Sequence, residues 1–334
     1  MEKIPLLLLV VLLCACKKSD QEMTAERKKT DASVNIDYAQ EMRNFVIGIS
    51  KYAKNANPKF AIIPQNGIAL VTVDGEKTSA PSTAYLNAID GNGQEDLYYG
   101  YDNDDQPTPA TVNNDLRSFL DISKKNGKKI LVTDYCSTPS NMTRSYQVNF
   151  TNGYISFAAD ERELNNIPDF PAKINNENAN VVTSLSQAKN FLYLLNNTDN
   201  FNSKADFIKA VTATNYDALI MDAYFDKAAF TSAEINALKK KANGGKRIVI
   251  SYMSIGEAEN YRYYWQNTWK PGNPVWLDAE NPKWKGNYKV KYWNKDWQKI
   301  IYGNDASYLK KILNAGFDGV YLDIIDAFEY YEGN

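Results

Sequence analysis

Short apolar runs alternate with amphipathic stretches along most of this 334-residue chain. In the second half, four such runs each end on or just before a carboxylate, in the segments ALIMD (218–222), RIVISYMSIGE (247–257), PVWLD (274–278) and GVYLD (319–323). Near-continuous apolar runs of this length are typical of buried parallel strands. Helix-patterned segments separate at least three of them. The pattern therefore predicts a parallel sheet whose two faces are both covered.

The first half of the chain continues the same alternation. An apolar stripe at helical spacing between Tyr38 and Ala53 predicts a helix over 37–55, and a second stripe predicts a helix over 112–125. The expected strands are KFAII (59–63), AYLNAID, KILVTDYC (129–136), YISFAAD (154–160) and FLYLLNN (191–197). AYLNAID and its continuation through GNGQEDLYYG (84–100) are expected to give a strand and its loop.

Helix signals between the later strands are equally regular. Helices are expected over 204–212 and 305–314, the second stopped by Gly316. Thr231 and Glu234 form a capping-box pattern that opens a helix to Asn243. Eight or nine strand candidates favour a closed (β/α)8 TIM barrel over an open doubly wound sheet. A GxGxxG turn, which a dinucleotide-binding sheet would need, is absent from the sequence.

The order of the elements departs from that of a standard barrel, which begins on a strand and ends on a helix. This chain starts its folded part on a helix and ends just after the strand GVYLD. We therefore expect a circularly permuted barrel, which is tolerated because natural termini lie close together. KFAII should then pair in parallel beside GVYLD, and Tyr38 should lie near Tyr331.

The N-terminal residues predict export. A charged start and an apolar run over 4–13, too short to span a bilayer, end in Leu-Cys-Ala-Cys, with Cys16 last. We interpret 1–16 as a lipoprotein signal peptide with Cys16 as the lipidated residue; an ordinary secretory signal is the alternative. The polar segment 17–36 is expected to be a flexible tether, followed by a single domain over 37–334. The predicted location is the bacterial cell envelope, on the periplasmic side or the cell surface, with a lipid anchor in the membrane.

Composition narrows the chemistry. The chain has 38 Lys and Arg, 40 Asp and Glu, and no histidine, which excludes Ser-His-Asp triads, Cys-His pairs and histidine-based zinc sites. Carboxylates are therefore the expected acid–base groups, which points to sugar chemistry. After signal removal Cys136 is the one remaining cysteine, so an intramolecular disulfide is not expected. A net charge of -2 without a basic stripe argues against nucleic acid as a partner. We expect a monomer without cofactor or metal.

Several long motifs resemble one family. YDALIMDAYF, GGKRIVISYMSIGEAENYRYYW, PVWLDAENPKWKGNYKVKYW and AGFDGVYLDIIDAFEYYE, together with FAIIPQNG, AIDGNGQEDLYYG and KILVTDYCSTP, are similar to extracellular glycoside hydrolases related to endo-α-1,4-polygalactosaminidase, glycoside hydrolase family 114-like TIM barrels. In that family the PQNG, GNGQED and TDYC segments follow the GVYLD strand, whereas here they precede FLYLLNN. The motif order thus implies the same permutation as the element order.

The resemblance implies strands one to eight in the order FLYLLNN, ALIMD, RIVISYMS, PVWLD, GVYLD, FAIIPQN, the strand before Glu95, and KILVTDY, which leaves YISFAAD without a place. It implies hydrolysis of an α-linked galactosamine-type polysaccharide by Asp323 as nucleophile and Glu95 as acid/base. The GNGQED motif around Glu95 departs from the pattern of the fungal members. The residues expected to bind substrate are Asp222, Tyr252, Glu257, Arg262, Asp278, Asn66, Asp134 and Trp293.

Other interpretations of these residues stay open. Arg262 and Glu259 can form an i,i+3 ion pair that orients their loop. Trp276, Trp284, Tyr292 and Trp293 flank the PVWLD run and are expected to be mainly core, with one or two lining sugar subsites. Two further function classes remain: a non-catalytic glycan-binding lipoprotein that uses the same cleft, and an enzyme that binds a divalent cation through Asp and Glu alone.

Overall fold

Two parallel sheets form the centre of the structure, a computed structural model that describes residues 36–333. The five strands of the larger sheet follow the order β1 (Ala61–Pro64), β13 (Gly319–Asp323), β9 (Ile248–Ser254), β6 (Ala218–Met221) and β5 (Phe191–Leu194). The smaller sheet has the order β2 (Gly91–Glu95), β3 (Lys129–Tyr135) and β4 (Ile155–Ala159). Every ladder in both sheets is parallel. The predicted α/β class with a parallel sheet is confirmed.

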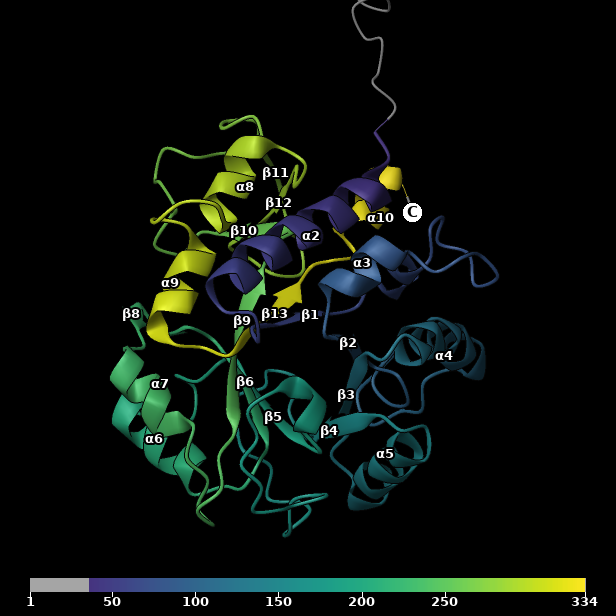
Figure 1. Cartoon of the computed structure of the whole chain (residues 1–334), viewed down its shortest axis with the longest axis vertical. Coiled ribbons are helices and arrows are strands. Elements are labelled where there is room, and N and C mark those ends of the chain that lie inside the picture. Colours follow the sequence, from purple (N-terminus) through teal and green to yellow (C-terminus); the bar gives the residue numbers. More distant parts are fainter. Residues whose placement is uncertain (1–35, 334) are drawn as a thin grey trace, which may run out of the picture. The chain divides into compact units, whose positions relative to one another are not determined.

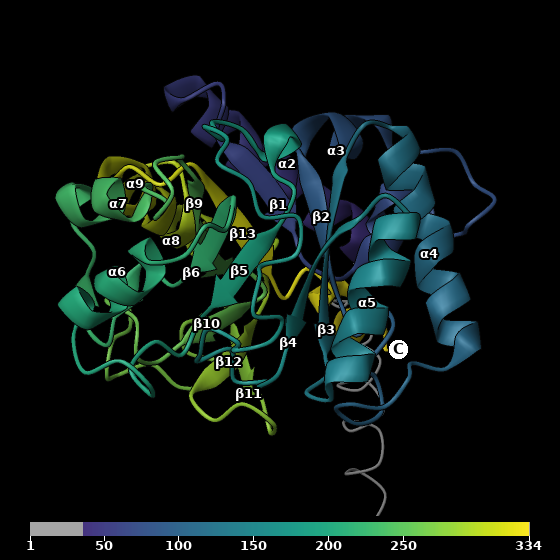
Figure 2. The same cartoon turned by 90° about the horizontal axis from the view of Figure 1, so that it is seen from below.

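The two sheets meet at two places. Gln65, after β1, forms a parallel bridge with Gly93 of β2, and the Asn66 amide donates to the Gly93 carbonyl at 2.9 Å. At the other edge β4 contacts β5, with the rings of Phe157 and Phe191 5.9 Å apart; Figure 2 shows these two strands side by side. The neighbour order is therefore β5-β6-β9-β13-β1-β2-β3-β4, with β4 again beside β5.

Helices lie outside the strands (Figure 1). They are α2 (Tyr38–Ala56), α3 (Thr83–Ala88), α4 (Ala110–Lys125), α5 (Pro139–Thr151), α6 (Lys204–Thr212), α7 (Ser232–Leu238), α8 (Lys295–Ile301), α9 (Tyr308–Ala315) and α10 (Ala327–Glu332). The predicted apolar stripe of α2 is buried, including Phe45, Val46 and Ile49. Residues from Tyr38 onward pack as one unit.

Both spatial neighbours expected of a permuted chain are present. Strand β1 pairs in parallel with β13, with Ala61 opposite Gly319. The rings of Tyr38 and Tyr331, near the two ends of the described chain, are 5.6 Å apart. The first helix therefore packs beside the segment that follows the last parallel strand.

The strand assignments of AYLNAID and PVWLD were wrong. Most of AYLNAID lies in the helix α3, and the strand β2 begins only after it, at Gly91. PVWLD does not join the parallel sheet: β11 (Leu277–Glu280) pairs antiparallel with β12 (Asn287–Val290), which also pairs with β10 (Glu257–Glu259). The apolar run is short and Val275 is 63% exposed, so it cannot serve as a buried central strand. YISFAAD was expected as a strand without a place in the order; it forms β4, between β3 and β5. Counted from β5, Asp323 thus ends the fourth parallel strand instead of the fifth, and Glu95 ends the sixth.

Helix α7 ends earlier than its local sequence signals predict. Its capping box is confirmed, because the Thr231 side chain and the Glu234 side chain accept each other's backbone amides. The helix ends at Leu238, however, and not at Asn243. The Lys239 carbonyl accepts from the Arg247 amide at 2.9 Å, which turns the chain back before the glycines are reached.

Strands β6, β13 and β2 have acidic residues at the same two positions, one before the strand and one at its carboxyl end. Each has an aspartate directly before it and a carboxylate at its other end, five residues later: Asp217 and Asp222, Asp318 and Asp323, Asp90 and Glu95. Each aspartate before the strand accepts a hydrogen bond from a backbone amide of a neighbouring chain segment, at 2.8 to 2.9 Å. Each also forms an ion pair with a lysine. Fixing one end of these alternate strands brings their trailing carboxylates to one common face.

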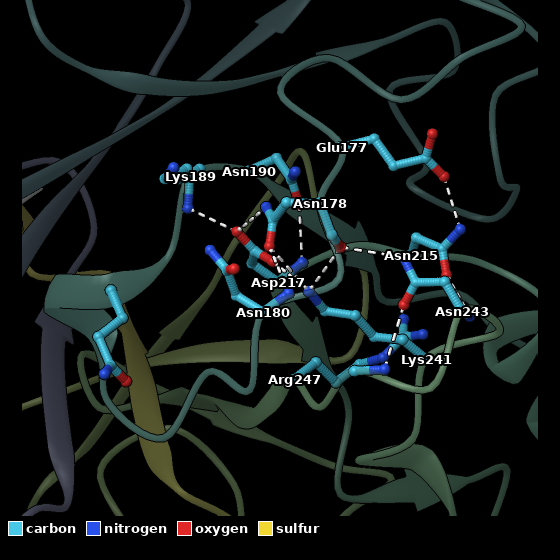
Figure 3. A network of polar contacts seen from close by, with 12 residues as sticks. Glu177, Asn178, Asn180, Lys189, Asn190, Asn215, Asp217, Lys241, Asn243 and Arg247 are labelled. Carbon is cyan, nitrogen blue, oxygen red and sulfur yellow. Dashed lines mark hydrogen bonds and ion pairs between the residues drawn. The ribbon is translucent and has the colours of Figure 1, made fainter.

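Asp217 forms the most buried of these anchors (Figure 3). Its carboxylate pairs with Lys241, and both side chains are fully shielded from solvent. The Asn178 amide donates to it at 2.9 Å, while the Asn190 side chain accepts from the Asp217 backbone amide at 2.7 Å. The asparagine-rich segment before β5 therefore covers the amino ends of β5 and β6 with satisfied polar groups.

Candidate active site

A cavity of about 510 Å³ lies at the carboxyl ends of the parallel strands. In barrel enzymes this end of the strands carries the site. Of the residues proposed from the sequence, the cavity is lined by Asn66, Glu95, Asp222, Tyr252, Glu257, Arg262 and Asp323. Asp323 and Glu95, from opposite ends of the described chain, thus lie on one cavity.

Asp323 is held at the end of β13 in a largely buried position. The Tyr252 hydroxyl, from the neighbouring strand β9, donates to Oδ2 of Asp323 at 2.7 Å. Burial, and next the negative charge of Glu95, raise the pKa of Asp323 to about 8, although the Tyr252 hydrogen bond acts in the opposite direction. The raised pKa favours the protonated form of Asp323 at neutral pH.

Glu95 is surrounded by neutral donors. Its carboxylate accepts from the Gln65 side chain, from Asn66 Nδ2 at 3.0 Å and from the Tyr135 hydroxyl. Gln65 is itself oriented by the Tyr193 hydroxyl, which donates to Gln65 Oε1 at 2.9 Å. Donors on both oxygens suit an ionised carboxylate, which can only accept.

The PQNG turn is what delivers two of these donors. Asn66 has a φ of 60° and Gly67 a φ of 51°, so the chain passes through the left-handed region directly after β1. Asparagine and glycine tolerate that region better than other residues. The Asn66 side chain then bridges Glu95 twice, because Oδ1 accepts the Glu95 backbone amide at 3.1 Å.

Arg262 is already engaged by protein carboxylates. Its guanidinium donates to Glu259 at 2.6 Å and to Asp222 at 2.8 Å, and its side chain is only 4% exposed. The expected i,i+3 pair with Glu259 is confirmed. Asp222 and Glu259 thus share one cation on the wall of the cavity. Neither Asp323 nor Glu95 has a lysine or arginine nitrogen within 4.0 Å in the described structure.

Glu257 adds a further buried carboxyl to the lining. Asn281 donates to Oε1 at 2.8 Å and the Lys289 ammonium lies 3.8 Å from the same atom. Oε2 is buried and accepts no hydrogen bond from the described residues within 3.5 Å. Burial raises the pKa of Glu257. An acceptor of this kind suits a hydroxyl or ammonium donor on a ligand.

Three proposed substrate-binding residues do not reach the cavity. Asp134 is fully buried and accepts from Ser145, Asn149 and two backbone amides, because the strand directs it toward α5. Asp278 lies in the antiparallel sheet and accepts from Tyr331 at 3.3 Å. Trp293 packs on Tyr38 and Tyr331 instead. The error for Asp278 follows from the wrong strand assignment of PVWLD. Cys16 lies outside the described residues.

The structure also identifies lining residues that sequence reasoning passed over. Among them are Gln65, Tyr135, Tyr193, Tyr261, Trp284 and Asp326, and also the cationic Arg162 and Lys285. Trp284, 52% exposed, was one of four tryptophan and tyrosine candidates near PVWLD, and it replaces Trp293 at the cavity. Gln65 could have been proposed from the sequence, because it belongs to the same PQNG motif as Asn66. The tyrosines of β3 and β5 are indistinguishable from core positions without knowledge of strand order.

Two properties of the described residues bear on metal binding and on membrane insertion. No group of three or more His, Cys, Asp or Glu side chains between residues 36 and 333 is arranged to hold a metal ion. Within the same range, none of the helices combines the length and apolar character that a membrane crossing needs.

About half of the chain is similar in sequence to known proteins. Residues 171–334 match the model of glycoside-hydrolase family GH114. The uncharacterized protein MJ1477 of Methanocaldococcus jannaschii is 41% identical over 171 residues, which are 49% of this chain and 45% of that protein. An uncharacterized protein of Thermotoga maritima is 36% identical over 143 residues, 42% of this chain and 40% of its own length.

A third relative, an uncharacterized protein of Deinococcus radiodurans, is 39% identical over 126 residues, 37% of this chain and 38% of that protein. The chain therefore spans less than half the length of each of these three relatives. The family match covers β5 through α10, including Asp222, Glu257 and Asp323. Glu95 lies outside it. The match supports a GH114-like glycoside hydrolase.

Proposed function

We propose that this protein is a glycoside hydrolase that cleaves an α-linked galactosamine-type polysaccharide with Asp323 and Glu95. The observation that carries the proposal is that these two carboxyls line one cavity without cationic partners, at the carboxyl ends of parallel strands. Glycosidic cleavage needs two such groups, one to protonate the leaving oxygen and one to act on the anomeric centre. The family match over 171–334 supports the same reaction class.

The fold proposed for this activity is a single permuted (β/α)8 barrel over 37–334. The support is the neighbour order of eight parallel strands, in which β4 returns to the side of β5. In a barrel whose chain starts on β5, the β1 to β4 half would follow β13. Here that half precedes β5, and α2 packs next to α10, which follows β13.

In the proposed reaction Asp323 attacks as nucleophile and Glu95 serves as acid/base. Because burial raises the pKa of Asp323, this assignment requires its proton to pass to Glu95, the acid, when substrate binds. A glycosamine ammonium near Asp323 would stabilise the ionised carboxylate and lower its pKa. Acidic side chains outnumber basic ones in the lining, a balance that favours a cationic sugar. The acidic ones are Glu95, Glu163, Asp222, Glu257, Glu259, Asp323 and Asp326, and the basic ones are Arg162, Arg262 and Lys285.

The alternative is a glycan-binding protein without catalysis that uses the same cavity. That function would be favoured if Asp323 were buried against a cation. Its hydrogen-bond partner is instead the Tyr252 hydroxyl, and its carboxyl faces the cavity. A carboxyl whose pKa is raised toward neutrality is typical of acid–base sites. The arrangement favours hydrolysis over binding alone.

The proposed location is the bacterial cell envelope, with the chain lipidated at Cys16 and acting as a monomer on a polysaccharide. Support comes from the sequence of 1–36 alone: an apolar run that ends at cysteine, followed by a polar segment. Metabolic labelling with an alkyne fatty acid tests this proposal. The full-length protein should be labelled, and Cys16→Ser should abolish the label.

Substrate identity is tested with a panel of polymers. Purified protein would be incubated with galactosamine-rich, N-acetylgalactosamine-rich and glucosamine-rich polysaccharides, and new reducing ends would be measured. The proposal predicts release from the galactosamine-rich polymer, with less release as its amino groups are acetylated. Equal release from all three, or release only from the fully acetylated polymer, would contradict the substrate assignment.

A further inference from the structure

A second, smaller hollow of about 200 Å³ adjoins the catalytic cavity. It is lined by Tyr224, Asp226 and Lys227 from the β7–β8 hairpin (Tyr224–Phe225 and Ala228–Ala229) and by Tyr261 to Tyr263 after β10. Tyr261 and Arg262 line both spaces, so they form the wall between them. The proposed mechanism uses neither Tyr261 nor the hollow.

Tyr261 has the properties of a fixed platform. Its hydroxyl donates to Glu259 Oε1 at 2.6 Å, and the Arg262 guanidinium carbon lies 5.1 Å from its ring centroid. Arg262 is in turn held by the carboxylates of Glu259 and Asp222. The contact with Arg262 and the hydrogen bond to Glu259 together fix the orientation of the Tyr261 ring. The side chain is nevertheless 54% exposed, which leaves ring surface open to the solvent.

The rest of the hollow is polar at its rim and aromatic at its wall. Tyr263, 41% exposed, lies against Tyr224 with centroids 6.3 Å apart and planes at 22°. Asp226 and Lys227 are exposed at the turn of the hairpin. Such a surface offers aromatic rings for the C–H face of a pyranose and charged groups for its hydroxyl or amino substituents.

We propose that this hollow is a distal subsite for a further sugar unit of the same glycan chain, with Tyr261 as the platform over which the chain leaves the catalytic cavity. The inference rests on the proposed function, since it assumes that a glycan occupies the main cavity. It adds that the protein binds a chain of several units along the line from Asp323 past Tyr261, so affinity should depend on chain length.

The test is a binding measurement by titration calorimetry in an Asp323→Asn background, so that turnover does not interfere. The probes are α-linked galactosamine oligosaccharides of two and six units. Tyr261→Ala should lower affinity for the longer probe about 3- to 10-fold, which is the range for loss of one aromatic contact. The shorter probe should lose less, because Tyr261 only borders the catalytic cavity. Tyr261→Phe should bind both like the parent. Asp226→Asn, which removes a carboxylate from the hollow alone, should weaken the longer, cationic probe alone.

Phe150→Ala is the matched control, because Phe150 is 67% exposed on α5 and outside both spaces. It should change neither affinity. Equal losses on both probes, or a Tyr261→Phe variant as impaired as Tyr261→Ala, would overturn the subsite and assign Tyr261 a positioning role through Glu259. If Tyr261→Ala loses affinity mainly for the longer probe while the wild type does not hydrolyse the polymer, the subsite is supported and the proposed hydrolase activity is overturned. Failure of both probes to bind would overturn both.

Discussion

The Tyr252 hydroxyl lies 2.7 Å from Oδ2 of Asp323, across the ladder that joins β9 to β13. The hydrogen bond fixes the carboxyl at the edge of the cavity and favours its ionised form against the effect of burial. Tyr252 is itself buried on the neighbouring strand, so it has little freedom to move away. The reactive state of Asp323 therefore depends on its strand neighbour as well as on Glu95.

Tyr252→Phe should lower kcat by roughly 10- to 100-fold, because the variant loses a hydrogen bond to a charged group while the ring keeps its packing. The pKa of Asp323 should rise further, which moves its titration to higher pH. Both effects are measured from steady-state kinetics over a pH series. Tyr146→Phe is the control, since Tyr146 is a buried tyrosine beside α5 and outside the cavity. An unchanged pH profile in Tyr252→Phe would contradict this role.

The pH dependence of kcat/KM distinguishes the roles of the two carboxyls, because it reports the free enzyme. If Asp323 attacks as nucleophile, only its ionised form is active, and kcat/KM should rise with pH through about 8. If Asp323 were the acid, kcat/KM would fall through the same range. We expect the rising limb in wild type and its disappearance in a chemically rescued Asp323→Gly variant supplied with azide.

Asp323→Asn should stabilise the fold in a pH-dependent manner. The native pKa of about 8 lies above the ordinary value of 3.8, so the native state holds a proton that the unfolded state loses between these pH values. Wild-type stability attributable to this group therefore falls as pH rises from about 4 to 8, by at most about 1.4 kcal/mol per pH unit.

The asparagine variant lacks that penalty. Thermal unfolding should give similar Tm values for the two proteins at pH 4.5 and a higher Tm for the variant at pH 8.5. A difference in Tm that stays constant from pH 4.5 to 8.5 would show that Asp323 is not held protonated in the native state.

Lys241→Met should destabilise the protein without acting on catalysis directly. It would leave the Asp217 carboxylate buried without its cation, a change that typically costs about 3–5 kcal/mol. Lys239→Met removes the partially exposed partner of Asp318 and is the matched control, with an expected loss of about 1 kcal/mol. Urea unfolding measures both. A loss for Lys241→Met no larger than for Lys239→Met would contradict the anchoring role of the buried pair.

Much of this architecture follows from local patterns. The apolar runs of β6, β9 and β13 and the helices α4, α6 and α9 lie where periodicity and capping residues predict them. Asp222 and Asp323 could be assigned to the site from the sequence because the carboxyl ends of parallel strands lie at one common face. Glu95 was found through its motif, since GNGQE carries no apolar signal of a strand.

The errors arose where tertiary pairing decides the outcome. PVWL has the composition of a strand, but it pairs antiparallel with β12 at the rim. AYLNAID was expected as a strand, but its first part forms the helix α3. YISFAAD was expected as a strand, but its place between β3 and β5 depends on pairing that its own sequence does not specify. Which tryptophan reaches the cavity likewise depends on the turn between β11 and β12, and Trp284 is in that turn whereas Trp293 follows β12.

The most direct test of the account compares four proteins on a galactosamine-rich polymer: wild type, Asp323→Asn, Glu95→Gln and Asp278→Asn. Asp278 is the control carboxyl, because it lies outside the cavity and on the antiparallel sheet. With circular dichroism showing all four folded, release of reducing ends should persist in wild type and Asp278→Asn and fall at least about 1000-fold in the other two. Undiminished release from folded Asp323→Asn or Glu95→Gln would contradict the two-carboxylate site.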